Sequence, residues 1–205
     1  MQNSSVLPSK PKLIFASVMI VLAVIAAGFS LSLRYDGPKG SGTATIGGPF
    51  TLINQKGETV TEKTYAGKYM LMFFGFTFCK DVCPTELQVM TAALAQMGAD
   101  ADKIIPIIVS VDPERDTPEV MATYVSSFDK RLQGLTGSSE QVAAIAKAYH
   151  VFYKKVPDPN DPKDYEMDHS SILYVMGPDG KFLKHFTYST DAKALAQDLE
   201  KVLYL

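Results

Sequence analysis

The chain has 205 residues, of which 46% are hydrophobic and 20% are charged, and its formal net charge is −2. This length and composition suit one globular domain with an attachment, and they exclude disorder on a large scale. The first 34 residues hold three basic and no acidic side chains, so the rest of the chain has 17 basic and 22 acidic residues, a net charge of −5. That balance argues against nucleic acid as a partner.

Residues 13–33 form a stretch of 21 residues without a charged side chain. A helix of this length spans the hydrocarbon core of a bilayer. Lys10 and Lys12 precede it, so the positive-inside rule leaves residues 1–12 in the cytoplasm. The sequence therefore predicts a single-pass transmembrane anchor in a bacterial inner membrane, with the soluble domain facing the periplasm.

A cleaved signal peptide is the alternative interpretation of this stretch. Ala26, Ala27 and Gly28 are small residues at which a peptidase could act. The uncleaved anchor is favoured because the apolar run continues beyond them to the length of a full span. The absence of a cysteine near the span argues against a lipoprotein, and the absence of arginine before it gives a mitochondrial presequence little support.

The residues after the anchor divide into a tether, 34–47, and a folded domain, 48–205. The tether is rich in Gly, Ser and Thr. The domain opens with a hairpin pattern over residues 49–60. Residues 70–76 are then apolar except for Gly75, which predicts a strand buried on both faces.

Cys79 and Cys83, the two cysteines of the chain, directly follow this strand. Apolar residues recur at helical spacing after Pro84, which suits a first helical position and should push Cys83 out of the helical region. Free N–H groups and the dipole at such a helix start favour the thiolate. A structural disulfide would close only three intervening residues and restrain little chain, so redox or metal chemistry is the favoured interpretation.

The remaining chain alternates between strand and helix patterns. We expect a strand at 103–111, a helix at 118–128 started by Asp116 or Thr117, a turn at 134–137, a helix from Ser138 or Ser139, a short extended piece at 151–153, an irregular mobile loop at 156–168, a strand at 171–176, its hairpin partner at 181–187 and a helix at 191–203. This order predicts a mixed sheet flanked by helices. With a cysteine pair ending the first core strand, the fold class is α/β and thioredoxin-like.

The three histidines differ in their surroundings. His150 ends a predicted helix and His185 lies in a strand, so structural roles are expected for both. His169 lies at the mouth of the 156–168 loop, next to Asp168, which could fix its tautomer. Two thiolates and one imidazole form a soft donor set that suits Cu(I) and also accommodates Cu(II) or Zn(II). Structural zinc normally has four protein ligands, so copper is favoured over zinc.

Three sequence blocks resemble the SCO1/SenC family of copper proteins. Residues 77–84 look like its Cys-x-x-x-Cys-Pro metal motif, residues 111–118 are similar to its second block, and residues 168–180 resemble its third. The resemblance extends from about Gly47 to the C-terminus. Lys80 stands where many members have a proline, which alters local charge and loop stiffness and leaves the ligands in place.

The resemblance implies a thioredoxin-like domain that binds one copper, as Cu(I), Cu(II) or both, through Cys79, Cys83 and His169. It also implies a membrane-anchored copper chaperone that helps assemble the binuclear copper centre of cytochrome c oxidase. Its partner would be subunit II of that oxidase or another copper-accepting protein. Asp112 and Asp116 would support the ligands or face a partner, with a turn and a helix cap as equally good roles.

Two other functions remain open at this point. The chain could be an exported thiol–disulfide oxidoreductase with Cys79 and Cys83 as its redox-active pair, which would make it an enzyme. It could also be a copper or redox sensor whose acidic loop contacts a partner. A ligand role for His169 distinguishes copper binding from the oxidoreductase, because disulfide exchange needs only the thiols.

Overall fold

The computed structural model describes residues 45–159, 161 and 164–204, and they form a seven-stranded mixed sheet beside a two-stranded hairpin. The sheet has the order β2-β1-β5-β4-β3-β8-β9. Its strands are β1 (Thr51–Asn54), β2 (Thr59–Thr61), β3 (Tyr69–Gly75), β4 (Ile104–Ser110), β5 (Gln133–Thr136), β8 (Ile172–Met176) and β9 (Phe182–Thr187). The central strand β3 pairs in parallel with β4 and antiparallel with β8.

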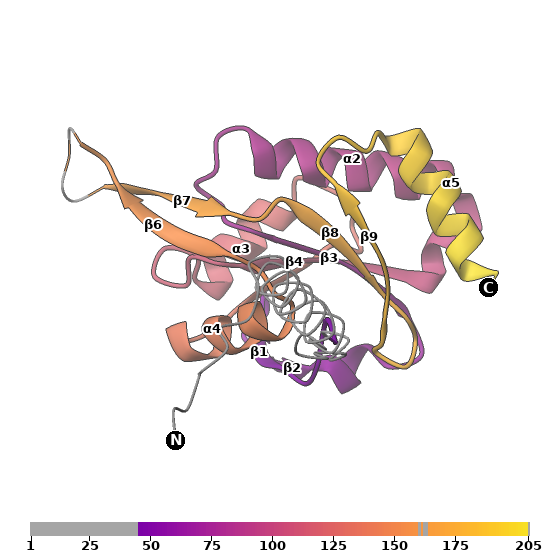
Figure 1. The fold of residues 1–205 in the computed structure, drawn as a ribbon, viewed down its shortest axis with the longest axis horizontal. Helices are drawn as coiled ribbons and strands as arrows, with labels where there is room; N and C mark the ends of the chain where they lie inside the picture. The colour runs from indigo at the N-terminus through magenta and orange to yellow at the C-terminus, as the bar shows by residue number, and fades with distance from the viewer. Residues whose placement is uncertain (1–44, 160, 162–163, 205) are drawn as a thin grey trace, which may run out of the picture. The chain divides into compact units, whose positions relative to one another are not determined.

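Helices cover both faces of this sheet. They are α2 (Val82–Gln96), α3 (Pro118–Val125), α4 (Ser139–Ala148) and α5 (Ala192–Leu203), with short 3-10 helices η1 (Glu62–Tyr65) and η2 (Gly98–Lys103). Helices α2 and α5 lie side by side over one face of the sheet, and α4 lies on the other side (Figure 1). The predicted α/β fold, thioredoxin-like with a mixed sheet flanked by helices, is confirmed.

The core is built around β3, as its apolar run predicts. The six apolar residues between positions 70 and 76 are at most 2% exposed, and Gly75 is also buried. Helices α2 and α5 cover one face of the sheet and α4 lies on the other side. Phe74 places its ring 5.4 Å from that of Tyr149 and 5.8 Å from that of Tyr174. The contact with Tyr174 is edge-to-face, and such contacts add to the free energy gained by burial.

The helix starts follow the expected capping chemistry. The Ser138 hydroxyl accepts a hydrogen bond from the backbone N–H of Gln141. The Gln141 side-chain oxygen accepts one from the backbone N–H of Ser138, which completes a capping box before α4. Asp191 likewise accepts from the N–H of Ala194 at the start of α5. These two predicted helix starts are confirmed.

The predicted turn at 134–137 is wrong, since β5 occupies Gln133–Thr136 between β4 and β1. Gly134 lies in this strand because helix α3 packs closely on it. A Cβ built on Gly134 would lie 3.0 Å from Val125 Cγ1 and 3.1 Å from Met121 Cε. The glycine therefore serves close approach of a helix, rather than reversal of the chain.

The prediction of an irregular loop over 156–168 is wrong in part. Tyr153–Pro157 forms β6 and Tyr165–His169 forms β7, and they pair antiparallel from Tyr153 opposite His169 to Pro157 opposite Tyr165. Only residues 158–164 connect the two strands. This hairpin projects away from the main sheet (Figure 1). The polar, proline-containing sequence is compatible with strands here because, in the part of the chain that the structure describes, each of the two strands has the other as its one partner and so leaves an edge unpaired.

The predicted transmembrane anchor at 13–33 lies outside the residues that the structure describes. Within the described ranges, no helix has both the length and the apolar character needed to cross a membrane.

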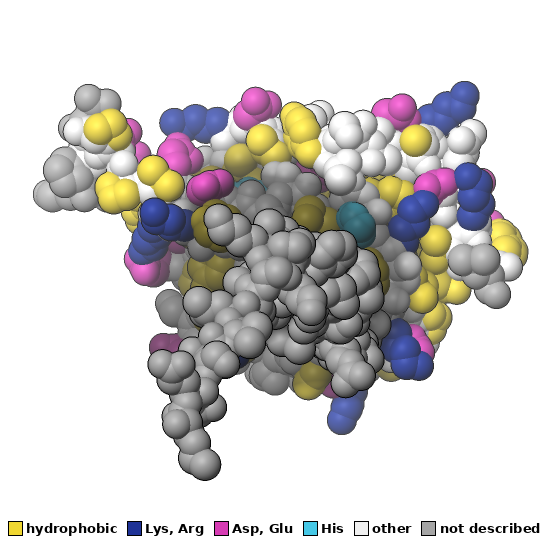
Figure 2. All heavy atoms as spheres, viewed as in Figure 1, with side chains coloured by type: hydrophobic (Ala, Val, Ile, Leu, Met, Phe, Trp, Pro, Cys, Tyr) yellow, Lys and Arg dark blue, Asp and Glu magenta, His cyan; other side chains and the backbone are white. Residues whose placement is uncertain are grey.

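Basic and acidic side chains are interspersed on the face of the molecule shown in Figure 2. Dark-blue and magenta groups lie beside one another around its rim, and the described residues form no continuous basic patch there.

The core contacts of Phe74 lead to a stability prediction. Phe74→Ala removes a fully buried ring and leaves a cavity, so the free energy of unfolding should fall by about 3–5 kcal/mol. Urea denaturation followed by circular dichroism measures this change. Leu183→Ala is the control, because Leu183 is 46% exposed and its truncation should change stability by less than about 0.5 kcal/mol. Equal losses for the two variants would contradict the assignment of Phe74 to the core.

Candidate metal centre

The cysteine loop joins the end of β3 to the start of α2. Asp81 precedes the helix, so Cys83 and Pro84 are its second and third residues. The expectation that Pro84 opens the helix and that Cys83 lies outside it is therefore wrong. Proline is tolerated in a first turn because N–H groups there have no intrahelical acceptor. The backbone N–H of Cys83 is in turn free to donate to Cys79 Sγ at 3.4 Å, so a helix-start N–H does point at a cysteine, as expected.

The thiol of Cys83 is fully buried against the end of β3. A Cβ built on Gly75 would lie 2.9 Å from Cys83 Sγ, a distance that no side chain could keep without displacing the sulfur. Gly75, the one residue that interrupts the apolar run, thus makes the space in which this sulfur lies. Cys79 is only half-buried and reaches the surface.

His169 enters the site from the last position of β7. Its ring lies edge-on to Phe76 and Phe73, at centroid distances of 5.7 and 6.0 Å, and its Nε2 lies 3.5 Å from Cys83 Sγ. Its Nδ1 lies 3.2 Å from the backbone oxygen of Ser170. A carbonyl oxygen can only accept, so the proton is assigned to Nδ1 and a lone pair to Nε2. The expected role of Asp168 in setting this tautomer is wrong, since Ser170 provides the partner and Asp168 is exposed.

The structure brings together Cys79, Cys83 and His169. One ligand atom from each, two sulfurs and one nitrogen, lie within 4.8 Å of one another. A metal with thiolate bonds of about 2.3 Å holds two sulfurs at most about 4.6 Å apart, so only small movements separate this arrangement from a coordinated one. His150 and His185 are both exposed and do not join the cluster.

The two thiols differ in protonation. A hydrogen bond from the Cys83 thiol, followed by hydrogen bonds from the backbone N–H groups of Cys83 and Asp81, lowers the pKa of Cys79 to about 3 against the opposing effect of burial. The same hydrogen bond to Cys79, followed by burial, raises the pKa of Cys83. The metal-free pair therefore carries one negative charge, on the half-exposed sulfur. A thiolate is the form that reacts and that binds metals.

A buried aspartate supports the cysteine loop from below. Asp116 is fully buried and accepts hydrogen bonds from the Thr77 hydroxyl at 2.6 Å, the Thr77 backbone N–H at 3.1 Å and the Ser110 hydroxyl at 2.6 Å. Burial raises the pKa of this carboxyl in spite of these hydrogen bonds. Asp116 thereby attaches Thr77, two residues before Cys79, to the neighbouring strand β4.

The expectations for the two aspartates are settled by their burial. Asp112 and Asp116 are 1% and 0% exposed, so the partner-facing role is wrong for both. The cap of α3 is Thr117, whose hydroxyl accepts from the backbone N–H of Val120, rather than Asp116. Both carboxylates instead hold the loops that surround the site.

Two buried polar groups near the site, on Glu86 and Tyr124, were not predicted from the sequence. Glu86, one helical turn after Cys83, is 1% exposed, and its Oε1 has no hydrogen-bond partner among the described residues. Burial raises the pKa of Glu86 to about 7. The hydroxyl of Tyr124 is also buried without a partner there, and burial followed by the charges of Cys83 and Cys79 raises its pKa. The helical spacing from Glu86 to the buried Met90 was a signal for the first of these.

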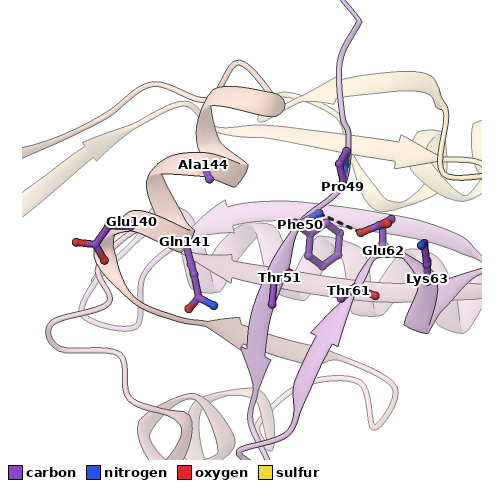
Figure 3. A pocket seen from close by; sticks show the side chains of 9 residues that line it. All are labelled: Pro49, Phe50, Thr51, Thr61, Glu62, Lys63, Glu140, Gln141 and Ala144. Atoms are coloured by element: carbon purple, nitrogen blue, oxygen red, sulfur yellow. Dashed lines mark hydrogen bonds between the residues drawn. The ribbon is translucent and has the colours of Figure 1, made fainter.

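A separate surface pocket of about 450 Å³ lies between the β1–β2 hairpin and α4 (Figure 3). Phe50 lines it, and the Phe50 backbone N–H donates to the Glu62 carboxylate at 3.0 Å. Lys63 and Glu140 stand at its edges. None of the cysteines or histidines lines this pocket, so it offers no donor set comparable with the cluster of Cys79, Cys83 and His169.

Comparison with known proteins finds the SCO1/SenC family model over residues 38–204. The chain is similar to the mitochondrial SCO1 homologue of Homo sapiens, with 44% identity over 147 residues, covering 71% of this chain and 48% of that protein. It is 40% identical to the mitochondrial SCO1 homologue 1 of Arabidopsis thaliana over 167 residues, covering 81% of this chain and 49% of that one. The chain thus spans about half the length of the curated relatives it matches.

Solved structures with the same fold include one with copper. The structure of Bradyrhizobium japonicum ScoI with copper bound shares 47% identity and a TM-score of 0.71, covering 76% of this chain and 98% of that one. A second, of BsSco, shares 27% identity and a TM-score of 0.61, covering 78% and 95%. Its description names a disulfide switch and a Sco family of cytochrome c oxidase assembly proteins.

The buried Glu86 leads to a pH prediction. Its pKa in the folded chain, about 7, lies above the ordinary value of 4.5, so folding favours the protonated carboxyl. The stabilisation that this preference provides is complete below pH 4.5 and is lost as the pH rises to 7, by at most about 1.4 kcal/mol per pH unit. Glu86→Gln removes the titrating group, so the reduced, metal-free variant should gain stability over the wild type between pH 5 and pH 8.

Urea denaturation of both proteins at pH 5, 6, 7 and 8 measures this difference. Glu119→Gln is the matched control, since Glu119 is exposed and its pKa is lowered. It should leave the pH dependence between 5 and 8 as in the wild type. A Glu86→Gln variant with the wild-type pH dependence would refute the burial of an ionisable carboxyl at this position.

Proposed function

Because the chain belongs to the SCO1/SenC family, we propose that it binds one copper ion through Cys79, Cys83 and His169 and delivers it during assembly of cytochrome c oxidase. The observation that carries this proposal is the cluster of two sulfurs and one imidazole nitrogen within 4.8 Å. Soft thiolate donors favour Cu(I), and imidazole extends the set to Cu(II). Structural zinc prefers four protein ligands, and this cluster supplies three.

The protonation states of the three side chains suit the binding of copper. Cys79 offers a thiolate at the surface, and Cys83 gives up its proton as the metal binds. His169 presents the lone pair of Nε2, because the Ser170 carbonyl holds the proton on Nδ1. Oxidation of the two thiols to a disulfide would remove both sulfur donors, so copper binding and the redox state of the pair are coupled in one site.

The proposed acceptor is the binuclear copper centre of cytochrome c oxidase subunit II, or another copper-accepting protein. Support comes from the description of BsSco as a member of a family of oxidase assembly proteins. It also comes from the half-exposure of Cys79, because a sulfur at the surface can be reached by donor atoms of a second protein.

Thiol–disulfide exchange with the acceptor is the second candidate function. It is favoured by the lowered pKa of the half-exposed Cys79, which makes this sulfur the attacking thiolate. Attack on an acceptor disulfide would form a mixed disulfide. Cys83 would then displace it, leaving an oxidised Cys79–Cys83 pair and an acceptor reduced to two thiols. This reaction needs no metal and no imidazole.

For the N-terminal region we propose a single-pass anchor at residues 13–33, with 1–12 in the cytoplasm, a tether at 34–47 and the copper-binding domain, 48–205, in the periplasm of a bacterium. The uncharged 21-residue stretch after Lys10 and Lys12 supports this arrangement. Resistance of the full chain to alkaline extraction from membranes tests it, and release into the soluble fraction would contradict it.

The copper site is tested by Cu(I) competition titration of the full-length, reduced chain. The wild type should bind one tight equivalent. Cys79→Ser and Cys83→Ser should abolish tight binding because each removes a thiolate. His169→Ala should weaken it about tenfold or more, since loss of a group that merely orients a ligand already costs about that much. His185→Ala is the matched control, because His185 is exposed outside the cluster and should leave the affinity unchanged.

The same variants separate the two candidate functions. In the copper-delivery function, His169→Ala weakens copper binding and leaves metal-free reduction of a model disulfide intact. Copper affinity that does not respond to His169→Ala would contradict the three-ligand site. If metal-free disulfide reduction remained strong in such a case, the oxidoreductase would be the better function.

A further inference from the structure

The hairpin that carries His169 has little to hold it in place. Its strands β6 and β7 form a two-stranded sheet of their own and pair with no other strand of the described residues. A two-stranded hairpin by itself is marginally stable in water. Met167, 7% exposed, is the one buried residue within the two strands, and most of the others are exposed. The position of His169 relative to the thiols therefore depends on contacts between the hairpin and the rest of the domain.

Arg115 makes the hydrogen bonds that join the hairpin to the loop after β4. Its Nε donates to Asp112 Oδ2 at 2.5 Å, and its Nη1 donates to the backbone oxygen of Tyr165 at 2.9 Å. The Tyr165 hydroxyl donates to the other oxygen of Asp112 at 2.8 Å. Asp112 is buried, so its carboxylate accepts one bond from the loop and one from the hairpin in a place that excludes most water.

The guanidinium group of Arg115 also packs against the cysteine loop. Its Cζ lies 3.8 Å from the ring centroid of Tyr165 on the hairpin, 4.6 Å from that of Phe78 and 5.9 Å from that of Phe76. Phe78 is the residue before Cys79, and the ring of Phe76 contacts the ring of His169. Arg115 thus lies between the segment that carries the imidazole and the segment that carries the thiols.

Other ion pairs between the hairpin and the domain are exposed. The Lys80 ammonium lies 3.7 Å from the Glu166 carboxylate, and these side chains are 88% and 56% exposed. Lys155 pairs with Glu114, and these side chains are 42% and 60% exposed. Exposed pairs of this kind contribute little to stability. The Arg115 side chain, by contrast, is only 16% exposed.

We infer that Arg115 is a positioning residue for the candidate metal centre. It holds the β6–β7 hairpin against the cysteine loop and so keeps His169 Nε2 close to the two sulfurs. The role requires the planar, forked guanidinium, which stacks on Tyr165 and bonds to Asp112 at the same time; a lysine has the charge without this geometry. The inference that this distance matters for copper rests on the proposed function, whereas the positioning of His169 does not.

A double-mutant cycle on the full-length, reduced chain tests whether Arg115 acts through His169. Arg115→Lys should lower Cu(I) affinity about tenfold, close to the loss caused by His169→Ala. The combined variant Arg115→Lys/His169→Ala should bind no more weakly than His169→Ala alone, because the imidazole that Arg115 positions is already gone. Additive losses would overturn the inference, since they would mean that Arg115 acts on the thiols or on the fold.

Arg131→Lys is the matched control. Arg131 also makes a forked pair, with Asp129 at 2.9 and 2.6 Å, but in the loop before β5, where no contact with the hairpin is found among the described residues. It should leave Cu(I) affinity unchanged. If the Arg115→Lys and Arg131→Lys variants unfold at equal urea midpoints, a loss of Cu(I) affinity seen only in Arg115→Lys does not come from a loss of folding.

NMR spectra of the metal-free protein give a readout that does not depend on copper. The rings of Phe73 and Phe76 lie edge-on to His169, so movement of the imidazole changes its ring proton shifts. Arg115→Lys should shift the His169 signals and leave those of His185 in place, and Arg131→Lys should shift neither. Unchanged His169 signals in Arg115→Lys would overturn the inference. Shifted signals in a chain that binds no copper would support the positioning role and refute the proposed function.

Discussion

Seven residues of β3 pair in parallel with seven residues of β4, from Tyr69 opposite Ile104 to Gly75 opposite Ser110. Because the strands are parallel, the loops that leave them emerge at the same edge of the sheet. The loop after β3 carries the cysteines, and the loop after β4 carries Asp112 to Asp116. The hydrogen bonds from Thr77 to Asp116 tie the two loops together, so the thiols lie on a support made of both.

The third donor comes from a different part of the fold. His169 is 86 residues from Cys83 in the sequence and lies on a hairpin outside the main sheet. The cysteine spacing is a local property that a helix start imposes, whereas the imidazole reaches the sulfurs through tertiary contacts alone. Of the three donors, Cys83 lies in α2, Cys79 in the loop before it and His169 at the end of β7. The distance from the imidazole to the sulfurs therefore depends on how the hairpin packs on the rest of the domain.

The two central strands β3 and β4 could be predicted because continuous apolar runs such as Ile104–Ser110 have few alternatives in a domain of this size. Three of the expectations about secondary structure failed for physical reasons. Glycine is typical of turns, but Gly134 lies in strand β5, where its missing side chain allows α3 to pack closely. The stretch 156–168 is polar because its hairpin lies in solvent. Neither the spacing of apolar residues nor the amino-acid composition indicates strands of this kind. Pro84 is the third residue of α2, whereas the preference of proline for the first helical position predicted that the helix begins there. Cys79, Cys83 and His169 could be predicted as ligands from their residue types. The contacts of His169 with Cys83 and of Arg115 with Tyr165 could not, because they join segments that are far apart in the sequence.

The unequal burial of the two cysteines makes access to the site one-sided. The sulfur of Cys83 lies in the space left by Gly75, beneath the start of α2, where solvent does not reach it. Cys79, by contrast, is only half-buried. Any incoming thiolate, oxidant or alkylating reagent therefore encounters Cys79 first, and an exchange reaction proceeds inward from it. The geometry thereby sets an order of events: contact with the outside begins at one sulfur, and the other is the last to be released.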